Sequence, residues 1–265
     1  MPGADAHCPG AAPCERPLSR DHSAAGSLVL PISETFVSLQ GEGKLCGVPT
    51  FFIRASGCNL RCAWCDTPHA SWNPEGGPRR IDELIAQAAA SGARHVVLTG
   101  GEPMMFSSIE PLAAGLREAG LHTTIETAGT MFREPACDLM SISPKLASST
   151  PPAGDPRDPS GQWRSRHEER RIDVGVLQRL IDAARSRPDG LQLKFVVTGP
   201  ADLPEIDALL ARLTGWCNRD ILLMPEGVVP AAAAFRQWLA AECIGRNWTY
   251  CQRLHIELFG NTRGT

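Results

Sequence analysis

Three cysteines, Cys58, Cys62 and Cys65, stand close together in the sequence, with three residues and then two residues between them. Thiolates on one tight loop can bind a single iron–sulfur cluster. A four-iron cluster ordinarily takes four cysteine ligands, so three nearby cysteines leave one iron with an open coordination position. In catalytic metal sites such a position binds a substrate or a cofactor. The spacing therefore predicts a 4Fe-4S cluster that takes part in chemistry.

Two other uses of these cysteines are compatible with the spacing alone. A zinc ion would require a fourth Cys or His ligand, and His69 could supply it. A thiol redox pair would require a Cys-x-x-Cys at the start of a helix. The rest of the sequence supports the cluster independently.

A glycine-rich segment, Gly100-Gly101-Glu102-Pro103, follows the next predicted strand. Glycine lets the backbone approach a ligand closely, and the Glu102 carboxylate offers a negative charge to an ammonium group. Taken alone, the segment could be a strand-to-helix turn with Pro103 opening the helix. Its position one strand after the cysteine loop favours a ligand-binding turn.

Composition and charge narrow the class of protein. The chain has 265 residues, 43% of them hydrophobic, which is enough for one catalytic domain with a substantial core. The net charge of -3 provides no basic field for nucleic acid. We find no apolar run of roughly eighteen residues and no signal segment, so we expect a cytoplasmic protein with no membrane partner. Away from the cluster loop, the remaining cysteines are expected to be small buried hydrophobic residues in a reducing compartment.

The elements that would position these residues follow an alternating pattern. Residues 1–27 are rich in Ala, Gly, Pro and Ser and are expected to be a disordered tail. Over residues 28–265, short apolar runs alternate with helical spacing, which predicts one α/β domain, a partial TIM-like barrel of about six parallel strands with outer helices. The predicted strands are Thr50–Ala55, His95–Thr99, His122–Thr127, Asp138–Ser143, Leu191–Val197, Ile221–Met224 and Leu254–Phe259. The predicted helices lie near Arg80–Ser91, Ser107–Ala119, Val174–Arg187, Leu203–Thr214 and Ala231–Cys243. The stretch Ala147–Arg170 breaks the alternation and is predicted to be an exposed loop insertion.

The cysteine spacing, with Trp64 directly before the last cysteine, resembles the signature of the radical S-adenosylmethionine superfamily. In that superfamily the glycine-rich turn and its acidic residue receive the amino group of the methionine moiety. The resemblance narrows to the 7-carboxy-7-deazaguanine synthase family, whose opening is similar to residues Glu34–Gly43. Further similar segments are Cys65–Thr67, Thr124–Thr130, Ser141–Lys145, Leu193–Val197 and Leu223–Gly227, and together the matches cover nearly everything from Glu34 to Gly264. The clearest departures are the N-terminal tail and the stretch Ala147–Arg170.

This resemblance implies a radical SAM carbon–nitrogen lyase of queuosine biosynthesis. Its reaction would convert 6-carboxy-5,6,7,8-tetrahydropterin to 7-carboxy-7-deazaguanine with loss of ammonia. The implied cofactors are a 4Fe-4S cluster, S-adenosylmethionine and Mg²⁺, and the cofactors supply the difficult chemistry. The implied partners are the small pterin substrate, an electron donor such as flavodoxin or ferredoxin, and a second copy of the chain in a homodimer.

The resemblance also assigns site residues, position by position. The implied substrate contacts are Leu39, Gln40, Gly41, Arg54 and Thr99. The implied contacts to S-adenosylmethionine are Trp64, Cys65, Asp66, Gly101, Glu102, Ser143, Pro144 and Lys145. Thr67 resembles the position that contacts magnesium, and Glu126 is the candidate for substrate positioning or proton handling.

Several of these residues also have other possible roles. The planar fork of Arg54 suits a substrate carboxylate, but Arg54 could instead form a structural ion pair. The Thr67 hydroxyl suits a hydrated hard cation, but it could instead cap a helix. Glu126 could instead bind a sugar hydroxyl of the cofactor. His255, on the predicted strand Leu254–Phe259, is expected to satisfy a buried backbone group rather than reach the site.

Two other functions remain open at this point. A glycyl-radical activating enzyme of the same superfamily would act on a protein partner and would usually show extra cysteines or a peptide groove. A non-enzymatic iron–sulfur or zinc-binding protein would leave the Gly100–Pro103 turn without a purpose. The opening segment Glu34–Gly43 and the carboxylate-suited Arg54 favour the small-molecule enzyme.

Overall fold

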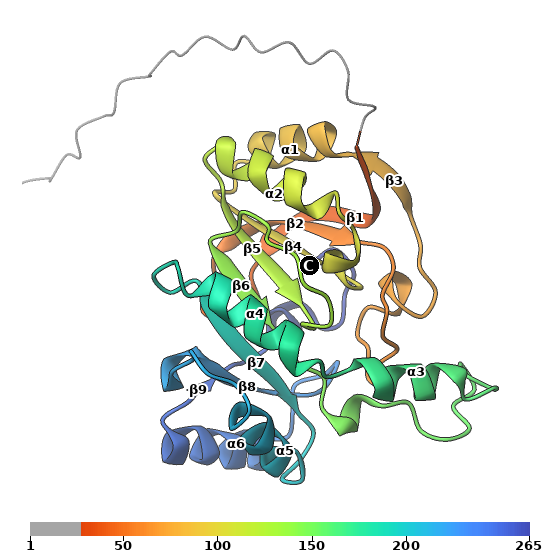
Figure 1. Ribbon diagram of the computed structural model, residues 1–265, viewed down its shortest axis with the longest axis vertical. Helices are drawn as coiled ribbons and strands as arrows, with labels where there is room; N and C mark the ends of the chain where they lie inside the picture. The colour runs from red at the N-terminus through yellow and green to blue at the C-terminus, as the bar shows by residue number, and fades with distance from the viewer. Residues whose placement is uncertain (1–27) are drawn as a thin grey trace, which may run out of the picture.

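The computed structural model describes residues 28–265, and the predicted disordered tail over residues 1–27 lies outside this range. The described residues form one nine-stranded sheet in the order β3-β1-β2-β4-β5-β6-β7-β8-β9. The end strands β3 and β9 do not pair with each other, so the barrel is open (Figure 1). The predicted partial barrel is therefore confirmed.

The parallel part of the sheet contains six of the seven strands that sequence patterning predicts. Its members are β2 (Pro49–Ala55), β4 (His95–Gly100), β5 (His122–Thr127), β6 (Leu139–Ile142), β7 (Leu191–Val197) and β8 (Ile221–Pro225), followed by the short β9 (Thr249–Tyr250). Every residue of β7 and β8 is buried, and accordingly β8 is a continuous apolar run and β7 is apolar except for Gln192 and Lys194. Their carboxyl ends meet at one edge of the sheet, where ligands bind in open α/β folds.

Two antiparallel strands extend the sheet on its other side, and the sequence analysis did not predict them as strands. The strand β1 (Val29–Leu39) pairs antiparallel with β2, and β3 (Gly77–Arg80) pairs antiparallel with β1. The pairing of Leu39 with Pro49 places the end of β1 beside the start of β2. The segment that follows β1 therefore turns back toward the parallel strands.

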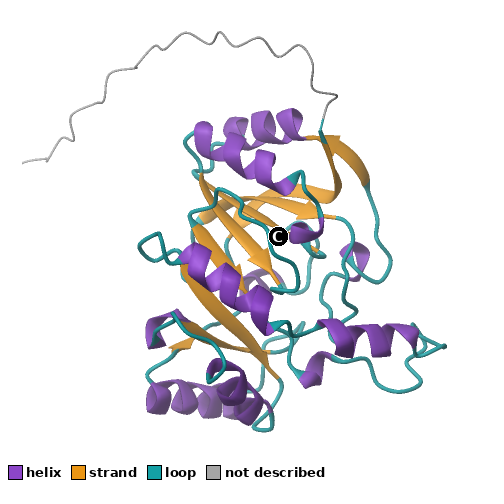
Figure 2. Cartoon of the chain, viewed as in Figure 1, coloured by secondary structure: helices purple, strands orange, loops and turns teal. Residues whose placement is uncertain are grey.

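Helices cover the outside of the barrel (Figure 2). They are α1 (Ile81–Ala90), α2 (Ile109–Glu118), α4 (Val174–Ala184), α5 (Asp202–Leu210) and α6 (Ala233–Arg246), each close to a predicted helix. Their apolar faces pack on the sheet, as Leu84 of α1 and Leu116 of α2 show by having no exposed surface. Short 3-10 helices occupy Pro68–Ala70, Pro103–Met105, Ala147–Ser149 and Asn218–Asp220. Within residues 28–265, no helix is both long enough and apolar enough to cross a membrane.

The predicted strand Leu254–Phe259 is wrong, because this segment forms the helix α7 (Leu254–Phe259). The Ile256 N–H donates to the Arg253 carbonyl, and Gly260 ends the helix with a φ of 68°. The sheet edge beside β8 is already occupied by β9. The sheet ends at β9, and the segment Leu254–Phe259 does not continue it.

The stretch Ala147–Arg170 is exposed over most of its length, as the sequence predicts, but it is not a loop throughout. It contains the 3-10 helix Ala147–Ser149 and the helix α3 (Gln162–Arg170), which lies to the side of the sheet (Figure 1). Polar residues of the stretch are buried, among them Ser149 and His167, which have no exposed surface. The stretch packs against the cysteine loop through polar groups, and apolar patterning does not detect such packing.

Candidate active site

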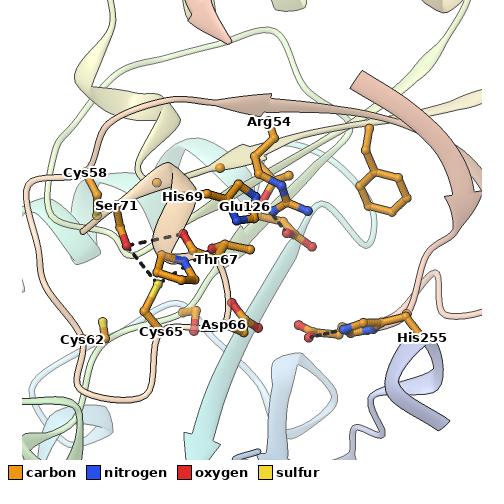
Figure 3. Close-up of a pocket in the computed structure, with 18 of the residues that line it drawn as sticks. Arg54, Cys58, Cys62, Cys65, Asp66, Thr67, His69, Ser71, Glu126 and His255 are labelled. Atoms are coloured by element: carbon orange, nitrogen blue, oxygen red, sulfur yellow. Dashed lines mark hydrogen bonds and ion pairs between the residues drawn. The ribbon is translucent and has the colours of Figure 1, made fainter. Parts of the chain in front are cut away.

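A cavity of about 410 Å³ opens at the carboxyl ends of the parallel strands. Such volumes are typical of small-molecule and cofactor sites. The predicted site residues that line it are Leu39, Gln40, Gly41, Arg54, Cys58, Cys62, Trp64, Cys65, Asp66, Thr67, Thr99, Gly101, Glu126, Ser143 and Lys145. Figure 3 shows the three cysteines on one side of this space, with Arg54 and Glu126 across from them. Residues from distant parts of the sequence therefore share one site.

The cysteine loop and the glycine turn are held together by backbone contacts. The Glu102 N–H donates to the Gly57 carbonyl at 2.9 Å, and the Gly57 N–H donates to the Ala70 carbonyl at 2.9 Å. A Cβ atom at Gly101 would lie 2.1 Å from the Gly57 carbonyl oxygen, closer than atoms can approach. Glycine at this position is therefore required for the two ligand-binding segments to meet.

The three cysteines fit an iron–sulfur cluster. Burial raises the pKa of the Cys58 and Cys62 thiols, so a bound cluster must displace a proton from each of them. The Cys65 sulfur lies 3.1 Å from the Ser71 hydroxyl. In the described part of the chain, no three His, Cys, Asp or Glu side chains are gathered closely enough to hold a single metal ion. A cluster does not require that, because it places each thiolate on a different iron.

Glu102 and Pro144 do not line the cavity, although the sequence predicts both as cofactor contacts. The Glu102 carboxylate has no exposed surface and accepts hydrogen bonds from the Met104 N–H, the Thr127 hydroxyl and the Ala128 N–H at 2.8–3.0 Å. Burial raises the pKa of Glu102. In this structure the carboxylate joins the glycine turn to the end of β5, and its contact with an ammonium group stays a prediction.

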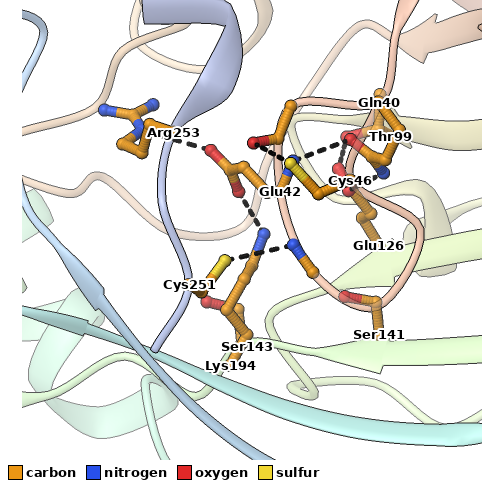
Figure 4. A network of polar contacts seen from close by, with 12 residues as sticks. Gln40, Glu42, Cys46, Thr99, Glu126, Ser141, Ser143, Lys194, Cys251 and Arg253 are labelled. Carbon is orange, nitrogen blue, oxygen red and sulfur yellow. Dashed lines mark hydrogen bonds and ion pairs between the residues drawn. The ribbon is translucent and has the colours of Figure 1, made fainter. Parts of the chain in front are cut away.

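Glu126 is held on the cavity wall by two neighbouring polar side chains. Its carboxylate accepts hydrogen bonds from the Gln40 amide at 3.1 Å and from the Thr99 hydroxyl at 2.8 Å (Figure 4). These three residues come from the segment after β1, from β4 and from β5. They form one polar surface with acceptors and donors in fixed positions, suited to a flat heterocycle edge.

Arg54 forms the structural ion pair that was the alternative to substrate binding. Its Nε donates to the Glu34 carboxylate at 2.7 Å, and the guanidinium lies over the Phe36 ring. Glu34 also accepts from Arg263 at 2.8 Å. Arg54 nevertheless lines the cavity, and its contact with Glu34 uses only the Nε edge of the fork. The ion pair orients the guanidinium and is compatible with carboxylate binding through the remaining N–H groups.

A buried charged network crosses the site, and the sequence analysis missed its members Glu42, Lys194 and Arg253. The Glu42 carboxylate pairs with the Lys194 ammonium and accepts from Arg253 Nε at 3.1 Å (Figure 4). Arg253 also pairs with Asp66 of the cysteine loop. Burial by itself would raise the pKa of Glu42, but Lys194 and Arg253 outweigh it and hold that pKa well below its usual range. The signal that could have revealed the network is Lys194, a charged residue within the largely apolar strand β7.

Two side chains near the network do not show the purely structural roles that were considered for them. His255 was expected to satisfy a buried backbone group, but it lines the cavity, with Nε2 4.0 Å from the Glu42 carboxylate. Burial lowers the pKa of His255. Thr67 precedes the 3-10 helix Pro68–Ala70, yet its hydroxyl makes no capping hydrogen bond. Thr67 lines the cavity, and magnesium binding by Thr67 remains a prediction.

An open parallel barrel with three cysteines and a glycine turn at its carboxyl edge defines the class of protein. Residues 52–187 match the Radical SAM superfamily. The fold and site are therefore those of a radical S-adenosylmethionine protein.

Curated relatives narrow this assignment. The chain is 47% identical to 7-carboxy-7-deazaguanine synthase of Rhodopirellula baltica, with 94% of this chain and 96% of the relative covered. It is 46% identical to the enzyme of the same name from Halobacterium salinarum, with 89% and 93% covered. The crystal structure of QueE from Escherichia coli matches with a TM-score of 0.64 at 30% identity, with 86% of this chain and 95% of that chain covered. The chain belongs to the 7-carboxy-7-deazaguanine synthase family.

Proposed function

We propose that the protein converts 6-carboxy-5,6,7,8-tetrahydropterin to 7-carboxy-7-deazaguanine with loss of ammonia, a step of queuosine biosynthesis. The observation that carries this proposal is the single cavity that joins the cysteine loop to the polar group of Gln40, Thr99 and Glu126. Family membership and the relatives' printed names support the same reaction.

The cofactors would be held on the cysteine side of the cavity. Cys58, Cys62 and Cys65 would hold the 4Fe-4S cluster, and S-adenosylmethionine would lie against Trp64, Asp66, Gly101, Ser143 and Lys145. When bound, these groups supply an electron and a radical able to abstract hydrogen. Lys145 donates to the Ser143 hydroxyl at 2.8 Å and lies over the Trp64 ring, so the three residues form one side of this space.

The substrate would be held on the opposite side. The free edge of the Arg54 guanidinium would bind the pterin carboxylate, and Gln40 would bind the edge of the ring. Glu126 would orient the ring and accept or return a proton during the rearrangement, since its oxygens already accept hydrogen bonds on the cavity wall. Thr67 would contact Mg²⁺ together with substrate oxygens and water.

The same proposal includes the electron donor, the oligomeric state and the fate of the product. A cytoplasmic electron donor such as flavodoxin or ferredoxin would reduce the cluster, and the active form would be a homodimer. The downstream product would be a deazapurine such as queuosine.

An anaerobic assay tests the reaction. Reconstituted, reduced protein is incubated with S-adenosylmethionine, Mg²⁺ and 6-carboxytetrahydropterin, and product and ammonia are followed by mass spectrometry and a coupled assay. We expect 7-carboxy-7-deazaguanine from the wild type and from Cys243→Ala, which changes a buried cysteine of α6, and none from Cys62→Ala. Release of 5'-deoxyadenosine without product would reject this substrate but retain the radical chemistry. An intact cluster with no 5'-deoxyadenosine would reject the enzymatic proposal.

A further inference from the structure

Arg61 is a buried cation within the cysteine loop. Its side chain is 8% exposed, and Nη1 donates to the carbonyls of Cys58 and Leu60, each at 2.7 Å. The guanidinium carbon lies 3.9 Å from the centre of the Trp163 ring of α3. Arg61 Nε is buried and has no acceptor among residues 28–265. The charged group is therefore covered on one side by an aromatic ring and held against the loop backbone on another.

Across the described residues, no carboxylate forms an ion pair with Arg61. Its hydrogen bonds go to neutral carbonyl groups, which orient the charge but do not neutralise it. A buried charge without a counter-charge is strongly unfavourable, and proteins pair such groups or bind an ion beside them. Because Nη1 donates to the Cys58 carbonyl, the unpaired charge lies against the loop that carries the three cysteines.

The stretch Ala147–Arg170 builds this arrangement. His167 Nδ1 accepts a hydrogen bond from the Arg61 N–H at 3.2 Å, and the Ser149 carbonyl accepts one from the Ala63 N–H at 2.8 Å. Trp163 of the same stretch covers the guanidinium. Both the backbone and the side chain of Arg61 are thus fixed by one insertion, which is why the guanidinium stays in the loop instead of reaching solvent.

We propose that Arg61 is the internal counter-ion of the iron–sulfur cluster and raises its reduction potential. The inference rests on the cluster-binding part of the proposed function. A cluster on three thiolates is anionic, and reduction adds a further negative charge to it. A fixed cation nearby stabilises the reduced form more than the oxidised form, and charge and hydrogen bonds near the sulfurs are established determinants of cluster potentials.

The test is a redox titration of the reconstituted full-length protein, in which the electron paramagnetic resonance signal of the reduced cluster is measured. Arg61→Gln keeps an N–H donor but removes the charge, and Arg61→Lys keeps the charge. At a fixed potential, we expect the ratio of reduced to oxidised cluster to fall about tenfold in Arg61→Gln, a shift of about 59 mV to lower potential. Arg61→Lys should stay close to the wild type. Arg170→Gln removes an exposed charge from the same insertion and should also leave the ratio unchanged.

An unchanged ratio in Arg61→Gln would overturn the proposal, and so would equal shifts in Arg61→Gln and Arg61→Lys, because both results would mean that the charge is irrelevant.

A second measurement remains if Arg61→Gln does not load a cluster. In the cluster-free protein the buried charge is uncompensated, so Arg61→Gln should raise the melting temperature there, and a lower melting temperature would overturn the proposal. Iron analysis of the wild type separates this result from a failure of the proposed function, which would show as the absence of a cluster.

Discussion

The ring of His167 accepts a hydrogen bond at Nδ1 from the backbone N–H of Arg61, across 106 positions of sequence. Because Nδ1 is an acceptor, the ring proton is on Nε2, which lies 2.8 Å from the Ser149 hydroxyl and donates to it. The Ser149 hydroxyl in turn donates to the Leu146 carbonyl at 2.6 Å. This buried chain of hydrogen bonds connects the stretch Ala147–Arg170 to the residue directly before the second cysteine of the loop.

His167→Ala should make the cluster less durable. The substitution leaves the Arg61 N–H buried without an acceptor, which costs about 1–3 kcal/mol and loosens the loop. We expect loss of the absorbance near roughly 400 nm to a chelator to be several-fold faster than in the wild type. His167→Asn places an amide oxygen close to the position of Nδ1 and should restore much of the durability. Equal decay rates in His167→Ala and the wild type would contradict a role for this contact.

Arg54→Ala should weaken binding of the carboxylated substrate while the cluster stays intact. Charge-assisted hydrogen bonds contribute about 1.5–3 kcal/mol, so we expect KM to rise roughly 10- to 150-fold. Glu34 keeps its contact with Arg263, which should preserve the fold. The control is a tetrahydropterin without the 6-carboxylate, on which the variant and the wild type should perform alike. A similar loss on both substrates would show that Arg54 acts only through the ion pair with Glu34.

Glu126→Gln should reduce product formation far more than substrate binding. The amide keeps the size of the side chain but removes the charge that accepts hydrogen bonds from Gln40 and Thr99. Loss of a general acid or base typically lowers the rate about 10²- to 10⁴-fold, so kcat should fall within that range. The amount of 5'-deoxyadenosine released per product should rise, because radical formation continues without productive rearrangement. A changed KM at constant kcat would assign Glu126 to binding alone.

The stability of the fold should decrease in mild acid because of His95. Its Nε2 lies 2.8 Å from the Thr124 hydroxyl and its Nδ1 lies 2.7 Å from the Thr50 hydroxyl, at the start of β4. Burial, aided by the charge of His122, lowers the pKa of His95 to about 4 from its usual value near 6.5. Between about pH 6.5 and 4 the unfolded chain therefore binds more protons at this residue, and the free energy of unfolding falls as the pH falls.

Denaturant unfolding at several pH values measures this effect. Above about pH 6.5 the stabilising contribution of His95 is fully present. Below that pH, His95→Gln should reduce the slope of the free energy of unfolding against pH by the equivalent of up to about one proton per molecule. An unchanged slope in His95→Gln would mean that other groups account for the acid sensitivity.

The parallel core was predictable from the sequence, and the physical reason is burial on both faces. The observed bounds of β5 and β7 equal the predicted ones. The strand β7 is largely apolar, whereas β5 consists mainly of β-branched Thr and Ile residues. The helices that cover them show the apolar spacing of a buried face, for instance Leu177, Leu180 and Ile181 in α4. Local pattern and tertiary environment agree in these elements.

The segment Leu254–Phe259 shows where pattern fails. Six residues with alternating apolar positions fit a strand or a short helix equally well, and only Ile256 is buried. The sheet ends at β9 without pairing with this segment, and the backbone hydrogen bonds of the segment close within the helix instead.

The sequence by itself determined the chemistry of this protein, because the spacing of Cys58, Cys62 and Cys65 and the glycine turn are local features whose geometry follows from a few consecutive residues. Only the tertiary structure decided which polar groups support that chemistry. The helix α3 has no apolar face, and its single fully buried residue is His167. Likewise, Glu42, Lys194 and Arg253 meet from three distant segments. A polar contact of this kind has no periodic pattern in the sequence, because it depends on the positions of partners that are far away along the chain.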